Sequence, residues 1–221
     1  MKTELLALVL LMVGFGGSPC NKEKEVKDKE TCTLITTGTQ TFMDKNLVVV
    51  TYRNGDVIPQ VTDQTAWASL TTGAWCHYNN DPANDTIYGK LYNWYAVNDP
   101  RGLAPQGWHI PTSAEWQCFS ISLGGEFVAG GKMKTTGTSR WNSPNTGATN
   151  ESRFAGLPGG YRCGKNSCGG FGMIGWSGYW WSTSEKGSDG AVHRDLSYAG
   201  AYLASNSAAK SSGFSVRCLR D

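Results

Sequence analysis

The sequence predicts an α+β domain with short strands, two or three helices and long loops. Residues 107–116 are typical of a strand that runs directly into a helix, since Trp108 and Ile110 alternate with polar residues before Pro111. Glycine and tryptophan are abundant, at 28 and 9 residues, which indicates many turns and a core rich in aromatic side chains. Only 17% of the residues are charged, against ~25% in average domains, and the net charge is +2. This near-neutral balance argues against nucleic acid as a partner.

The clearest helix follows residue 112. Thr112 and Glu115 have the spacing of a capping box, in which each side chain bonds the backbone N–H of the other residue. Trp116, Phe119 and Leu123 then recur at helical spacing, and the two glycines that follow end the helix. Two shorter helices are predicted at residues 63–70 and 88–97, where apolar residues gather on one side.

Strands are predicted where apolar residues alternate or run together between turn residues, at 33–37, 47–52, 154–157, 178–184, 191–198 and 214–219. Asn54 and Gly55 form a turn signal after the second of these strands. Residues 130–150 are predicted to be mostly loop. An all-β sandwich is the competing architecture, but it would leave the helix after residue 112 unexplained.

The first residues predict export. Residues 1–20 hold an apolar run that is too short to span a membrane, followed by small residues and Cys20, as in a secretory signal. A cysteine at this point resembles a bacterial lipoprotein cleavage site, at which Cys20 would be lipidated, although Pro19 stands where a small residue is usual. The expected address is the cell envelope, at the outer membrane or cell surface through a lipid anchor; plain secretion is the alternative. Residues 21–30 hold four lysines and four acidic residues and are predicted to be a flexible tether before a domain at 31–221.

Cysteine usage predicts disulfides. An even number of cysteines remains in an exported chain once Cys20 is set aside, namely Cys32, Cys76, Cys118, Cys163, Cys168 and Cys218. A bridge between the helix and the last strand, through residues 118 and 218, would stabilise the fold by about 4–5 kcal/mol in the chain-entropy model. The cysteines at 163 and 168 are close enough to pair locally, which would leave those at 32 and 76.

Six blocks of the sequence resemble one known family. They lie in that family's order at residues 38–43, 88–97, 107–116, 157–162, 178–182 and 213–218. The chain from about residue 31 to 221 is thereby similar to the Fibrobacter succinogenes major paralogous domain. The resemblance implies a C-type-lectin-like fold related to formylglycine-generating sulfatase-modifying domains, and an exported bacterial protein, often a lipoprotein of Bacteroidota. Tryptophans of these blocks are expected in the core: Trp94, Trp108, Trp116, Trp180 and Trp181.

The resemblance leaves the biochemical activity open. A non-enzymatic recognition or adhesion module for a glycan or a surface protein is the favoured function, and no catalytic residues, metal or cofactor are assigned to it. The alternative is a copper-dependent oxidase of the formylglycine-generating type, because Cys163 and Cys168 follow a Gly-Gly pair as that enzyme's cysteines do. Soft thiolates suit copper(I), although a disulfide is the more common use of two cysteines in an exported loop.

Two further stretches are candidate binding sites. Oxygen-bearing side chains that could bind calcium, or simply build a polar turn, gather at Asn79, Asn80, Asp81, Asn84 and Asp85. Residues 186–212 are rich in serine, alanine and glycine with tyrosines interspersed, a composition that suits either a recognition surface or a solvated loop. In lectin-like folds this region displays the ligand-binding surface. The ligand-binding residues predicted there are His193, Arg194, Asp195, Tyr198 and Tyr202.

Overall fold

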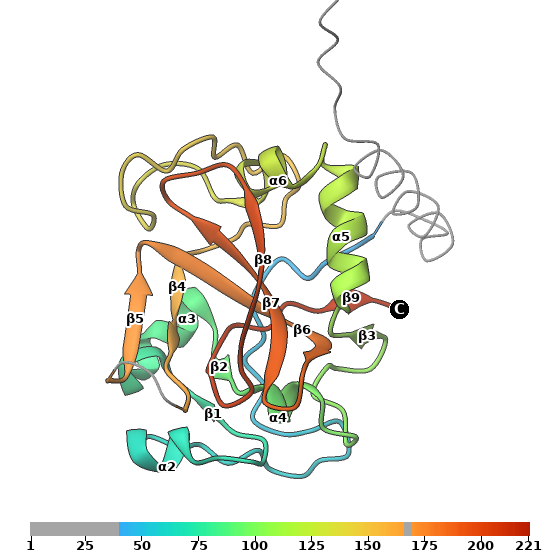
Figure 1. Cartoon of the computed structure of the whole chain (residues 1–221), viewed down its shortest axis with the longest axis vertical. Helices are drawn as coiled ribbons and strands as arrows, with labels where there is room; N and C mark the ends of the chain where they lie inside the picture. Colours follow the sequence, from blue (N-terminus) through green and yellow to red (C-terminus); the bar gives the residue numbers. More distant parts are fainter. Residues whose placement is uncertain (1–39, 166–168) are drawn as a thin grey trace, which may run out of the picture.

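A five-stranded sheet forms the centre of the computed structural model, which describes residues 40–165 and 169–221 (Figure 1). Its strand order is β5-β4-β6-β7-β8, with β4 and β6 parallel and the other pairs antiparallel. The strands are β4 (Gly159–Arg162), β5 (Phe171–Ile174), β6 (Ser177–Lys186), β7 (Gly190–Ser197) and β8 (Leu203–Ala209). Two small antiparallel ladders lie beside it: β1 (Trp75–Cys76) with β2 (Leu91–Tyr92), and β3 (Trp108–His109) with β9 (Leu219–Arg220).

Short helices surround the sheet: α2 (Gln64–Ala68), α3 (Asp85–Tyr88), α4 (Trp94–Val97), α5 (Ser113–Ser122) and α6 (Glu126–Met133), with 3₁₀ turns η1 (Tyr78–Asn80) and η2 (Pro82–Asn84). Helices α5 and α6 pack against β6, β7 and β8 (Figure 1). Within the described residues, no helix is both long and apolar enough to cross a bilayer. Mixed helices and strands of this kind confirm the α+β class.

The predicted strand-to-helix junction is confirmed. Thr112 caps α5, because its hydroxyl accepts from the Glu115 N–H at 3.2 Å while the Glu115 carboxylate accepts from the Thr112 N–H at 2.8 Å. The helix ends at Gly124 and Gly125, whose φ values of 102° and 97° few other residues adopt. The helix predicted at residues 63–70 is also present as α2, capped by Asp63.

The prediction of one helix at residues 88–97 is wrong. Helix α3 ends at Tyr88, strand β2 follows, and the separate helix α4 begins at Trp94. Buried Asn93 causes the break: its side-chain oxygen accepts from the N–H groups of Ala74 and Ala96, both at 3.0 Å, which caps α4 and ties it to the β1 segment. Residues 47–52, 154–157 and 214–218 form isolated bridges rather than the predicted strands. Helix α6 and strand β8 were not predicted. The strand predicted at 33–37 lies outside the described residues, as do residues 1–30.

Adjacent tryptophans on β6 join the sheet to the core on both of its faces. Trp180 packs with Trp116, Phe154 and Leu196, whereas Trp181 packs with Tyr92, Phe214 and other residues of a second cluster. Both are 0% exposed, and each indole N–H is bonded at 2.9 Å, to the Asn46 side chain and the Tyr92 carbonyl respectively. The expected burial is confirmed for Trp94, Trp116, Trp180 and Trp181, while Trp108 is half-buried.

Three buried cationic side chains hold loops together through backbone carbonyls rather than carboxylates. Arg162, Lys134 and Arg217 are each at most 1% exposed. Burial lowers the pKa of Lys134 to about 8. Arg162 donates to the carbonyls of Val61 and Thr62, Lys134 to those of Thr146, Ser197 and Gly200, and Arg217 to those of Met43 and Phe154. The long loops thus find hydrogen-bond donors that a sheet or helix would otherwise supply.

The predicted bridge between residues 118 and 218 is wrong. Cys218 is a free, buried thiol in the cluster that contains Trp181, where no second described cysteine joins it. Cys76 is also free, so it does not pair with Cys32. Cys118 and Cys163 are disulfide-bonded, and the residues at 32 and 168 lie outside the described part of the chain.

Alkylation tests this cysteine assignment. Burial raises the pKa of Cys76 to about 11 and that of Cys218 to about 12, so both thiols are protonated and shielded in the native protein. Iodoacetamide should therefore label neither residue in buffer and both in denaturant without a reducing agent, as read by peptide mass spectrometry. A linked peptide that contains residues 118 and 218 would contradict the assignment.

Candidate functional site

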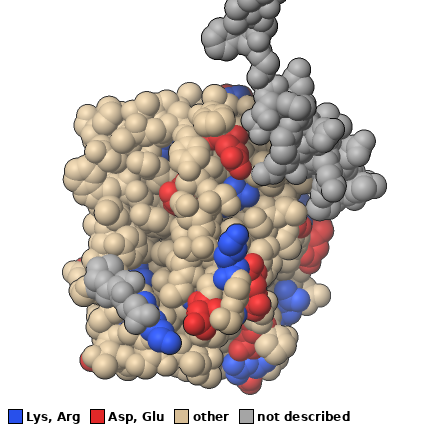
Figure 2. All heavy atoms as spheres, viewed as in Figure 1, with Lys and Arg blue, Asp and Glu red and all other residues tan. Residues whose placement is uncertain are grey.

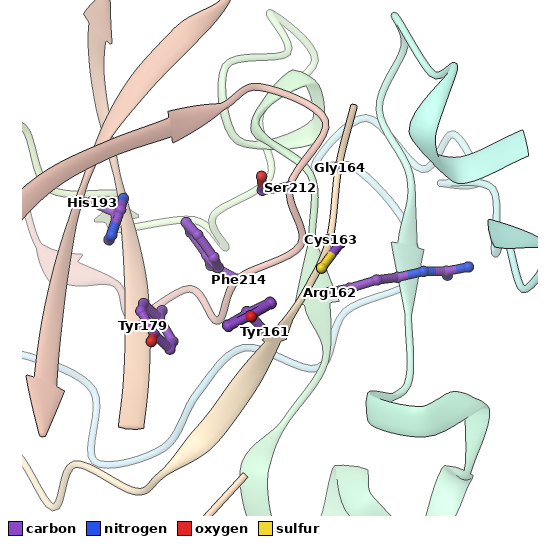
Figure 3. A pocket seen from close by; sticks show the side chains of 8 residues that line it. All are labelled: Tyr161, Arg162, Cys163, Gly164, Tyr179, His193, Ser212 and Phe214. Atoms are coloured by element: carbon purple, nitrogen blue, oxygen red, sulfur yellow. The ribbon is translucent and has the colours of Figure 1, made fainter. Parts of the chain in front are cut away.

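A cavity of about 200 Å³ opens on the face of the sheet that carries Trp181 (Figure 3). Its walls are mostly aromatic, and its lining residues are Tyr161, Arg162, Cys163, Gly164, Tyr179, His193, Ser212 and Phe214. Figure 3 shows the rings of His193, Phe214, Tyr179 and Tyr161 grouped together, while the Arg162 side chain extends away from them. The cavity thus combines aromatic surface with few polar groups, as small-molecule sites do.

Strand alternation brings these rings together. Tyr179 and Trp181 share one face of β6, and His193 on β7 lies directly opposite Trp181 in the ladder. Tyr161 reaches the same face from β4, the parallel neighbour of β6. Phe214 arrives from the segment after β8, which pairs with β2 through the bridge to Tyr92.

The rings pack closely enough to hold one another in place. Tyr179 stacks on Phe214 with centroids 5.2 Å apart and an interplanar angle of 19°, and it meets Tyr161 edge-on at 5.4 Å. His193 lies 4.7 Å from Phe214. Gly164 lets the chain after β4 lie close to the backbone at Ser212, because a Cβ atom at residue 164 would lie 2.5 Å from the Ser212 nitrogen. The cavity is therefore preformed rather than created by a ligand.

His193 stands out among the polar residues of the cavity because one of its ring nitrogens is buried without a described partner. It is 5% exposed, and among the described residues its Nδ1 atom has no hydrogen-bond partner. Its Nε2 atom lies 3.6 Å from Asp195 Oδ1, which favours the proton on Nε2 and leaves a free lone pair on Nδ1. Burial, with a smaller contribution from the Arg194 charge, lowers the pKa of His193 to about 4. The imidazole is therefore neutral at physiological pH.

Acidification is expected to destabilise the protein through His193. Its folded pKa of about 4 lies below the ordinary value of 6.5, so the unfolded chain binds a proton first as the pH falls. The free energy of unfolding should therefore be highest above pH 6.5 and should fall by roughly 3 kcal/mol between pH 6.5 and about pH 4. Urea unfolding of the wild type and of His193→Phe at pH 6.5 and at pH 4 measures this loss, which the variant should lack. Asp195, whose pKa burial raises, acts in the opposite direction in both proteins. Equal losses in the two proteins would contradict the assignment.

Two wider hollows, of about 550 and 600 Å³, lie elsewhere on the surface. The first lies between the η1 turn and β5, and the second lies near Lys210 and Tyr95. Neither is lined by a described side chain with a buried, unpartnered polar atom. The smaller aromatic cavity is therefore the better candidate site.

The five predicted ligand-binding residues do not form one surface. His193 lines the cavity, and Asp195 lies on the same face of β7, where Asn206 donates to it at 2.8 Å. Arg194 points to the opposite face, where it is 2% exposed and donates to the Ser113 carbonyl of α5 at 3.2 Å. The remaining two lie past the end of β7: Tyr198 packs edge-on against Trp176 with centroids 4.7 Å apart, and Tyr202 is 46% exposed.

The predicted calcium loop is a network of internal contacts. Asp81 accepts from the Ala83 N–H at 2.9 Å, and the amides of Asn80 and Asn84 donate to the carbonyls of Thr62 and Tyr78. One Asp85 oxygen meets His77 at 2.7 Å, and the other forms an ion pair with Lys90. In residues 40–165 and 169–221 no cluster of three histidine, cysteine or acidic side chains could hold a metal ion. Calcium binding by this loop, including Asn79, stays a prediction.

Of the two cysteines predicted to bind copper, one lies in the described part of the candidate site. Cys163 lines the aromatic cavity, and it is disulfide-bonded, whereas copper(I) needs thiolate ligands. Cys168 lies outside the described residues. Copper binding therefore stays a prediction that concerns the reduced protein.

Sequence reasoning missed most of the cavity. Tyr161, Tyr179 and Phe214 each lie in a block that resembles the family, but nothing in the sequence indicated that the three would meet. Alternation along residues 179–181 does place Tyr179 beside Trp181, on one face of a strand. The contact with Phe214 depends on the path of the chain after β8, for which no local pattern exists.

The comparisons agree with the resemblance found in the sequence. A family model for the Fibrobacter succinogenes major domain matches residues 35–220, which is most of the chain. No curated protein and no solved structure matches the chain. The matched segment contains the whole sheet, the helices and every residue that lines the aromatic cavity. The chain therefore belongs to the Fibrobacter succinogenes major domain family.

Proposed function

We propose that this protein is a non-enzymatic recognition module of the bacterial cell envelope, which binds one ring of a glycan or surface-protein ligand in the aromatic cavity. The observation that carries the proposal is His193 Nδ1, a buried acceptor without a partner in a cavity walled by three aromatic rings. Leaving such an atom unpaired costs about 1–3 kcal/mol, which a ligand donor would recover. The volume of about 200 Å³ is below the roughly 300–1,000 Å³ of drug-sized sites, so a single ring fits.

Recognition suits the chemistry of the lining better than catalysis does. A general acid or base works best with a pKa near the operating pH, whereas burial lowers the pKa of His193 to about 4. Aromatic faces offer area without requiring much side-chain ordering. Figure 2 shows a face that is mostly uncharged, on which acidic and basic side chains are intermingled where they occur, without a large patch of one sign. Binding would then depend on shape and a few hydrogen bonds.

A blocking variant tests the proposal. Ser212 lines the cavity, so Ser212→Phe should fill it; Ser205→Phe on exposed β8 introduces the same ring elsewhere. The purified full chain and the Ser205 variant should bind the same members of an immobilised panel of bacterial surface glycans, and the Ser212 variant should lose them. Equal binding by both variants, with unchanged melting temperatures, would refute the cavity as the binding site. No binding by the wild type, either to this panel or to purified envelope proteins, would refute the proposed function.

A C-type-lectin-like relation and a lipid anchor belong to the same proposal. Helices α5 and α6 packed on a mixed sheet with long connecting loops are compatible with a lectin-like architecture. The apolar run, Cys20 and the charged residues after it support an anchored domain held away from the membrane. The outer membrane or cell surface is the proposed address, with plain secretion as the alternative.

Lipidation makes a separate prediction. In a bacterial host with lipoprotein processing, the mature protein should begin at Cys20 and carry acyl chains, because the thioether-linked lipid anchors it to the membrane. Mass spectrometry of the N-terminal peptide and membrane fractionation check this, with Cys20→Ser as the control that should leave the membrane fraction. An unmodified residue 20 or a different mature N-terminus would overturn the prediction.

A copper-dependent oxidase is the second candidate function, because Cys163 lines the same cavity. Anaerobic titration of the reduced protein with copper(I), against Cys163→Ser, tests it. Tight stoichiometric binding that the variant loses would support the oxidase. A pair that stays oxidised and inert under mild reductant would refute it.

A further inference from the structure

We infer that the cavity accepts an uncharged pyranose ring and that His193 Nδ1 accepts a hydrogen bond from one of its hydroxyl groups. This inference rests on the proposed function, since it names the ligand of the same site. Three features carry it: the apolar walls, the buried and unpartnered Nδ1 atom of His193, and the charges around the cavity.

The walls suit a ring with an apolar face. The centroids of the stacked Tyr179 and Phe214 rings lie 5.2 Å apart, and Tyr161 stands edge-on to Tyr179 at 5.4 Å, so the aromatic lining is held at fixed angles. The axial C–H bonds of a pyranose form an apolar surface that gains free energy when it leaves water against such rings. The cavity of about 200 Å³ leaves room for one ring, with the remainder of a chain outside.

The polar group requires a donor from the ligand. Asp195 lies on the Nε2 side of the His193 imidazole, at 3.6 Å, and therefore favours the tautomer in which Nδ1 is an acceptor. Because this atom is almost fully shielded from solvent, a ligand hydroxyl group would donate to it after a small shift of the surrounding rings. The Ser212 hydroxyl also lines the cavity and offers a second polar contact to the same ligand. A hydrocarbon ring of the same size would leave the buried acceptor unpaired.

The surrounding charges disfavour an ionised ring. The Arg194 charge opposes protonation of His193, and the same field opposes a cation bound next to it. The Asp195 carboxylate, on the same face as His193, already accepts from the Asn206 amide at 2.8 Å. An anion would need charged donors, but the Arg162 guanidinium is already bonded to the carbonyls of Val61 and Thr62 and to the Gln64 side chain. It also lies between the rings of Trp67 and Phe171, at 4.5 and 5.0 Å from their centroids, away from the cavity. A neutral ring neither opposes the Arg194 charge nor requires a charged donor.

Matched sugars test the inference on the purified full chain. The neutral probes are the methyl glycosides of glucose, galactose and mannose; glucosamine and glucuronic acid have the same ring with a positive or a negative charge. The readout is the ¹⁵N chemical shift of the His193 ring nitrogens in two-bond ¹H–¹⁵N spectra, with His109 outside the cavity as an internal reference. At least one neutral glycoside should shift Nδ1 saturably at millimolar concentration, and its charged counterparts should bind at least tenfold more weakly.

Variants separate the inference from the proposed function. His193→Phe should weaken binding of the neutral glycoside at least tenfold, while His109→Phe should leave it unchanged. A charged ring that binds as well as the neutral one, or a neutral glycoside that binds His193→Phe normally, would overturn the inference and leave the recognition function standing. The inference would also fail if no glycoside bound while the glycan panel still lost binding on Ser212→Phe. Failure of the panel itself would refute the recognition function instead.

Discussion

Replacing Arg217 by methionine is expected to lower the free energy of unfolding by about 4 kcal/mol. The guanidinium is 1% exposed, donates to the carbonyls of Met43 and Phe154, and bonds the Asn46 side-chain oxygen through Nε and Nη2 at 2.9 and 2.7 Å. Methionine fills similar space but donates nothing, so two carbonyls lose this donor, at about 1–3 kcal/mol for each buried group left unpaired. The cation also loses its position over the Phe154 ring, 4.3 Å from the centroid.

Urea unfolding at neutral pH measures this loss. Arg220→Met is the matched control, because Arg220 is exposed near the end of the chain and should change stability by no more than ~0.5 kcal/mol. A loss below about 1 kcal/mol for Arg217→Met would show that water or a rearranged loop satisfies these carbonyls, and the proposed role of the buried cations would then be wrong.

Trp181→Ala is expected to cost about 4 kcal/mol and to abolish ligand binding. The side chain is 0% exposed, packs on Phe214 with centroids 4.4 Å apart, and donates to the Tyr92 carbonyl at 2.9 Å. Truncation of a buried tryptophan leaves a cavity and an unpaired carbonyl, and such changes typically cost about 3–5 kcal/mol. Because the Trp181 ring also lies 6.0 Å from the His193 ring, the wall of the proposed binding cavity would lose its support.

Trp176→Ala provides the control for this prediction. Trp176 is 45% exposed and lies outside the cavity lining, so its truncation should cost far less and leave binding unchanged. The milder Trp181→Phe keeps a ring against Phe214, and its loss of stability should be intermediate. Equal losses for Trp176→Ala and Trp181→Ala would contradict the assignment of Trp181 to the core.

Features that depend on a few neighbouring residues were predictable from the sequence. The capping box of Thr112 and Glu115 forms as predicted, since it requires only side chains within one turn of the helix. The helix predicted at residues 63–70 is present as α2. Strands β6 and β7 were also predicted, because aromatic and β-branched residues alternate or run together there.

Features that depend on distant contacts were not predictable. Apolar residues at 88–97 have helical spacing, yet Asn93 uses its side chain to bond Ala74, which lies 19 positions earlier, and the helix is interrupted. Strand β8 has few apolar residues and exists because β7 pairs with it over seven residues. Tertiary hydrogen bonds outweigh local preference in both places.

The candidate site also combines features set by neighbouring residues with features set by distant contacts. His193 was predicted to bind a ligand from its place in residues 186–212. It lines the cavity, and its role in binding stays a prediction. Arg194, which was predicted to bind the same ligand, lies on the other face of β7, as strict alternation requires for consecutive residues. Tyr161 and Phe214 come from segments 32 positions before and 21 positions after His193, so only the folded chain reveals that they share its cavity.

Intermolecular nuclear Overhauser effects between a bound neutral glycoside and the aromatic side chains would locate the ligand. If the cavity is the recognition site, the C–H protons of the sugar ring should give cross-peaks to the ring protons of Tyr179 and Phe214, and these should vanish in Ser212→Phe. Cross-peaks confined to Tyr198, Tyr202 or Trp176 would place the ligand on the exposed residues past the end of β7 and would contradict the cavity as the recognition site.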